Sequence, residues 1–91
     1  MTEKIAAKIE DRLIATHVSN NVDFEEACVN NNYNRILQIF DEEMETNNLS
    51  TKGAKKLKDE IQLMIYKHKS GTEIMFKVWN ARLAGTGNAV I

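Results

Sequence analysis

The stretch YNRILQIFDEEM, residues 33–44, decides the fold class because it carries the clearest helical pattern in the chain. Its apolar residues recur at spacings of one, three and four, as they do on one face of an amphipathic α-helix. They are Tyr33, Ile36, Leu37, Phe40 and Met44. Acidic residues follow Phe40 on the other side, and we predict a helix over residues 33–46.

An asparagine triplet separates this helix from the segment before it. Asp23, with Glu26 three residues later, is typical of a capping box, and it predicts a helix over residues 23–30 with the apolar face Phe24, Ala27 and Cys28. Phe24 and Tyr33 are nine residues apart, so in one continuous helix they would lie on opposite sides. The sequence therefore predicts a break at Asn30–Asn32, where Asn tolerates left-handed backbone conformations.

Three more helices are expected in the rest of the chain. The first spans residues 2–17 with Thr2 as N-cap, and its apolar stripe is Ile5, Ile9, Leu13 and Ile14. The next spans residues 51–69 with Ser50 or Thr51 as N-cap, and its stripe is Ala54, Leu57, Ile61, Met64, Ile65 and His68. The last begins with a second capping box, Ser70 with Glu73, and is expected to stop at Gly85.

Length and composition agree with an all-α fold. The chain has 91 residues, no Pro and four Gly, whereas a β-sandwich or barrel needs many tight turns. The apolar share of 43% and the charged share of 27% are ordinary for a globular protein. We predict a small compact bundle of about four helices, the second helical stretch being broken near Asn30–Asn32, with one domain over residues 1–84 and a tail over 85–91.

Cysteine usage and hydropathy indicate a soluble cytoplasmic protein. Cys28 is the only cysteine, so no internal disulfide can form. No run of about 18 apolar residues is present to span a membrane, and charged residues interrupt the first fourteen positions, unlike a secretory signal. Ten Asn, nine Lys and nine Ile are typical of an AT-rich genome, such as that of a phage or mobile element.

Charge is distributed unevenly along the chain. Residues 1–48 hold four basic and ten acidic residues, a net charge of −6, and residues 49–91 hold eight basic and three acidic residues, a net charge of +5. We expect the acidic half to lie against the basic half, within one chain or between chains in a head-to-tail oligomer. The alternative is that the basic half faces an anionic partner.

Catalytic and metal-binding patterns are absent from the sequence. His17, Cys28 and His68 lack the spacing of a metal motif, so no metal and no cofactor are expected. The acidic run over 41–45 has no partner acid or base in the pattern and is interpreted as a solvated helix face. We therefore expect that the protein is not an enzyme.

The last helix is apolar on nearly all sides. Between Ile74 and Ala84 only Lys77, Asn80 and Arg82 are polar, and a chain of this size cannot surround one helix completely. An exposed apolar patch marks an interaction surface, and the expected interface is Ile74, Met75, Phe76, Val78, Trp79 and Leu83. The leading hypothesis is a small interaction protein, an inhibitor, adaptor or assembly subunit, that binds another protein or a second copy of itself.

Two patterns suggest nucleic acid or a nucleotide as the alternative partner. A helix start favours anions, and the basic start at 50–58 contains Ser50, Thr51, Lys52, Lys55, Lys56 and Lys58. Residues 24–40 can also be interpreted as a helix-turn-helix whose second helix presents Asn34, Arg35 and Gln38 to bases. Flanking acidic residues, which phosphates would repel, argue against this second interpretation.

Overall fold

The computed structural model describes residues 12–49 and 52–90, the side chains of 52–53 and 84–90 excepted. Within this part of the chain every regular element is an α-helix: residues 12–19, α2 (Val22–Val29), α3 (Tyr33–Thr46), α4 (Lys52–Tyr66) and α5 (Gly71–Val90). The all-α class is confirmed. The expected number of about four helices is corrected to five in the described residues, because the break at Asn30–Asn32 makes α2 and α3 two separate helices.

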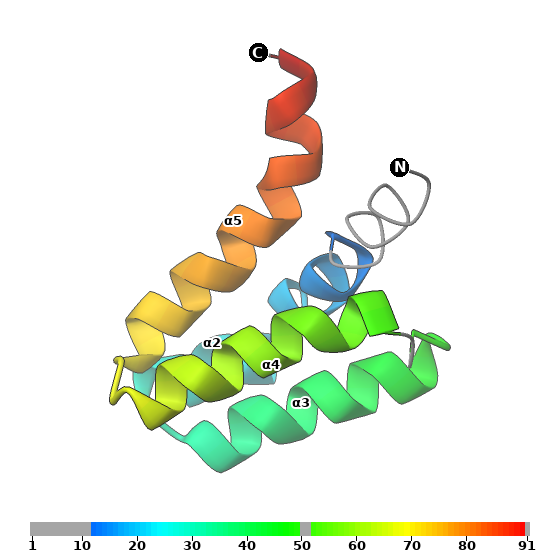
Figure 1. The fold of residues 1–91 in the computed structure, drawn as a ribbon. Coiled ribbons are helices and arrows are strands. Elements are labelled where there is room, and N and C mark those ends of the chain that lie inside the picture. The colour runs from blue at the N-terminus through cyan, green and yellow to red at the C-terminus, as the bar shows by residue number, and fades with distance from the viewer. Residues whose placement is uncertain (1–11, 50–51, 91) are drawn as a thin grey trace.

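The helices pack into one compact unit around a shared core. α3 and α4 lie side by side and run in opposite directions, α2 lies behind α4, and α5 rises from the turn after α4 (Figure 1). α2 contacts α3 and α5, and α4 contacts the same two helices. The Cα radius of gyration is 12.5 Å, which is the value typical of a compact domain of this length.

Short polar side chains begin the helices. Asn21 caps α2 by accepting a hydrogen bond from the Asp23 N–H at 3.0 Å, so the expected Asp23 cap is wrong and the helix starts earlier. The expected capping box of α5 is confirmed: the Glu73 N–H donates to Ser70 Oγ and the Ser70 N–H donates to Glu73 Oε2, both at 3.2 Å. Such caps satisfy N–H groups that have no partner inside the helix.

Three helices end in the same left-handed turn. Asn31, Asn48 and His68 have φ values of 56°, 56° and 61°, in the left-handed region that Gly adopts freely and Asn more readily than most other residues. After α4, the Lys69 N–H donates to the Met64 carbonyl at 2.9 Å and the His68 N–H donates to the Ile65 carbonyl at 3.0 Å, the two bonds of a Schellman motif. The prediction that His68 lies on the apolar stripe of a helix reaching residue 69 is therefore wrong, since the chain reverses there.

The buried residues come from every described helix. The buried rings of Phe24 and Phe40 pack edge to face, with their centroids 6.2 Å apart. Leu13 is 39% exposed, so of the predicted first stripe only Ile14 is buried among the described residues, while Thr2, Ile5 and Ile9 lie outside them. The core consists of Ile14, Ala15, Val18, Phe24, Ala27, Cys28, Ile36, Ile39, Phe40, Met44, Ala54, Leu57, Ile61, Ile74 and Val78.

A close backbone contact positions α5 against α2. A Cβ atom added to Gly71 would lie 1.8 Å from the Cys28 carbonyl oxygen, so no side chain fits at this position. The Gly71 N–H also donates to Asn31 Oδ1 at 2.8 Å. These two contacts bring the start of α5 directly against the end of α2.

The C-terminal helix is longer than expected. The predicted stop at Gly85 is wrong, because α5 continues to Val90, and its last turns extend beyond α2, α3 and α4 (Figure 1). Gly lowers helix stability by about 1 kcal/mol relative to Ala, but it ends a helix only when its φ turns positive, and no described Gly has a positive φ. None of the helices found in the described residues has the length and apolarity that crossing a membrane requires.

Candidate interaction surface

The six residues expected to form an interface divide between two faces of α5. Ile74 and Val78 are fully buried, because this side of α5 packs against α2 and α4. They belong to the core and are not available to a partner. Met75 is partly buried against the same core. Phe76, Trp79 and Leu83 remain 58%, 38% and 55% exposed.

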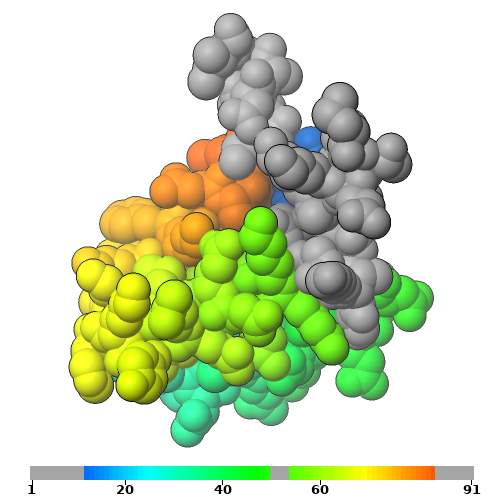
Figure 2. Space-filling view, viewed as in Figure 1, coloured from blue at the N-terminus to red at the C-terminus, as the bar shows by residue number. Residues whose placement is uncertain are grey.

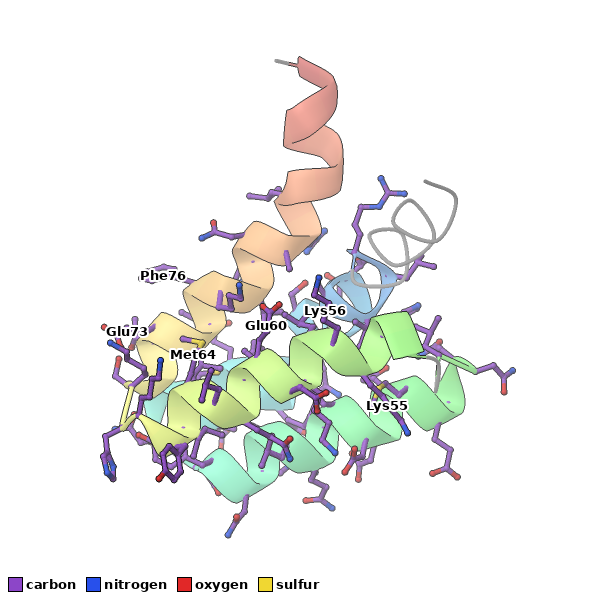
Figure 3. All side chains as sticks on the ribbon, viewed as in Figure 1. Lys55, Lys56, Glu60, Met64, Glu73 and Phe76 are labelled. Carbon is purple, nitrogen blue, oxygen red and sulfur yellow. The ribbon has the colours of Figure 1, made fainter. Side chains whose placement is uncertain are left out.

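The three exposed residues form one stripe, which we call the outer stripe of α5. Phe76, Trp79 and Leu83 are separated by three and four residues, so they line one face of the helix. Val78 follows Phe76 by two positions, about 200° around the axis, and therefore faces the core. Figure 3 shows Phe76 projecting from the side of α5 that is turned away from α4.

Arg82 contacts Trp79, the middle residue of the outer stripe. Its guanidinium lies 4.9 Å from the centroid of the Trp79 ring, a cation–π contact. The Nη1 atom of Arg82 also donates to Ser19 Oγ at 3.1 Å and to Asn20 Oδ1 at 3.2 Å. These contacts join α5 to the end of the helix at residues 12–19 and place the Arg82 guanidinium on the Trp79 ring.

Charged groups beside the outer stripe already have partners. Lys77 Nζ lies 2.7 Å from Glu60 Oε2 across the α4–α5 contact, and Glu73 belongs to the capping box. α4 and the first turns of α5 share one face of the molecule (Figure 2). The outer stripe is thus an apolar strip with a polar border.

Three side chains of the predicted anion site, those of Lys55, Lys56 and Lys58, belong to the described part of the chain. Ser50 and Thr51 and the side chain of Lys52 lie outside what the structure describes. Lys58 Nζ lies 2.6 Å from Asp41 Oδ1, so its charge is neutralised by α3. Lys55 and Lys56 are exposed and leave α4 in different directions (Figure 3).

Ion pairing of Arg35 also argues against the helix-turn-helix interpretation. Its Nη2 atom lies 3.1 Å from Asp23 Oδ2 and its Nη1 atom lies 3.4 Å from Glu42 Oε1. An open hollow of about 270 Å³ lies beside these groups, lined by Asp23, Glu26, Ala27, Asn30, Asn32 and Arg35. Two carboxylates and one guanidinium give this hollow a negative net charge, which does not favour phosphate.

Charge pairing between the two halves of the chain is limited. In the described residues, Lys58 and Asp41 form the one ion pair that joins the basic half to the acidic half. Arg35 pairs within the acidic half and Lys77 pairs within the basic half. Among the described residues, the two halves meet mainly through the apolar core.

Cys28 is a core residue. It is fully buried, and burial, with a smaller effect of Glu25, raises the pKa of its thiol from 9.0 to about 12. A thiol that stays protonated at neutral pH is a poor nucleophile. The described part of the chain contains no cluster of three His, Cys, Asp or Glu side chains that could hold a metal ion.

Two residues that shape this surface were not identified from the sequence. Arg82 stands three positions after Trp79, a spacing that places the side chains side by side on a helix, so this signal was present. The other is Gly71, and no local pattern reveals its contact with the Cys28 backbone.

Comparison with protein-family models, with characterised proteins and with solved structures finds no match to this chain.

Proposed function

We propose that the protein is a small non-catalytic interaction module that binds another protein, or a second copy of itself, through the outer stripe of α5. The observation that carries the proposal is the exposure of Phe76, Trp79 and Leu83 on one face of a helix whose opposite face is core. A surface helix normally has polar residues on its outer side. Contiguous exposed apolar side chains with a polar border mark interaction sites.

Contacts of neighbouring residues join α5, which carries the outer stripe, to the rest of the fold. Gly71 fixes the start of α5 against α2, Lys77 ties its middle to Glu60, and Arg82 ties it further along to Ser19 and Asn20. An inhibitor, an adaptor or an assembly subunit, of phage or mobile-element origin, would use such a surface.

The test compares substitutions on two exposed positions. Phe76→Glu places a charge on the outer stripe, and Leu63→Glu is the matched control because Leu63 on α4 is 52% exposed. Light scattering after size-exclusion chromatography measures association, and circular dichroism measures helicity. We expect Phe76→Glu and Trp79→Ala to reduce association with helicity retained, and Leu63→Glu to change neither.

Unfolding of both outer-stripe variants would show that these side chains serve the core, and the proposal would fail. Association that is lost with Leu63→Glu but retained with Phe76→Glu would place the interface elsewhere and would also overturn it.

Anion binding by the basic start of α4 is the alternative function, and it has less support. Its charge is reduced by the pairing of Lys58 with Asp41. A peak with high absorbance at 260 nm, lost at high salt and in the combined Lys52, Lys55 and Lys56 to Glu variant, would favour nucleic acid instead.

A further inference from the structure

We draw no further inference here: the strongest candidate, the exposed apolar surface patch of Phe76, Trp79 and Leu83 on the outer face of α5, belongs to the surface already described, and nothing in the structure shows what covers it.

Discussion

Replacing Gly71 by Ala tests the close contact between the start of α5 and α2. The added Cβ would lie 1.8 Å from the carbonyl oxygen of Cys28 and 2.6 Å from its carbonyl carbon. These are backbone atoms of α2, so they cannot rotate away as a flexible side chain could. The start of α5 must instead move outward by more than about 1 Å to reach an ordinary contact distance.

The expected change in the free energy of unfolding combines two destabilising effects and one stabilising effect. Overpacking of a tight core contact costs about 3 kcal/mol at the upper end of its usual range. Movement of α5 also breaks the hydrogen bond from Gly71 N–H to Asn31 Oδ1, a loss of about 1 kcal/mol. The higher helix propensity of Ala returns up to about 1 kcal/mol. We expect Gly71→Ala to lower the free energy of unfolding by about 3 kcal/mol, which corresponds to a decrease in Tm of about 12–24 °C.

Urea unfolding followed by circular dichroism measures this change. Thr72→Ala is the matched control, since Thr72 is the exposed neighbour on the same helix turn, and its effect should stay within about 0.5 kcal/mol. A Gly71→Ala protein as stable as the wild type, or more stable, would refute the close approach of α5 to α2.

Three further predictions concern helix ends and the core. His68→Gly should raise the free energy of unfolding by about 1 kcal/mol in urea titrations, because His68 has a φ of 61°; destabilisation would contradict the left-handed turn. Ser70→Ala should lower it by about 1 kcal/mol through loss of the cap on Glu73 N–H, and an unchanged Tm would contradict this. Because the pKa of Cys28 is raised from 9.0 to about 12 in the fold, its contribution to stability is present below pH 9 and declines as the pH rises toward 12. Unfolding titrations at increasing alkaline pH should show this loss in the wild type but not in Cys28→Ala, and equal slopes would contradict it.

Local pattern was sufficient for most of the helices. The apolar periodicity of residues 33–44 and the asparagine triplet placed α3 at Tyr33–Thr46, as the structure shows. The capping box of Ser70 and Glu73 was likewise predicted and is confirmed. Helix periodicity and caps depend on residues a few positions apart, so the sequence contains the information needed to identify them.

The predicted helix ends were wrong at residues whose local pattern is compatible both with a helix and with its end. His68 matches the period of the α4 stripe, yet it forms the left-handed turn after Tyr66. Gly85 is typical of a helix stop, yet α5 continues through it. In both places the local preference is about 1 kcal/mol or less, and packing elsewhere in the fold can reverse it.

The sequence by itself determined the all-α class, the division of the chain near Asn30–Asn32, and the presence of one helix with more apolar surface than a small domain can bury. Tertiary structure alone decided that Ile74 and Val78 face the core while Phe76, Trp79 and Leu83 face outward. The physical reason is that α5 is apolar on nearly all sides, so its own pattern does not specify which side is buried. The buried side is the one that packs on α2 and α4, and it includes the contact of Gly71 with the Cys28 backbone, 43 positions earlier, which forms only when α2 and α5 pack together.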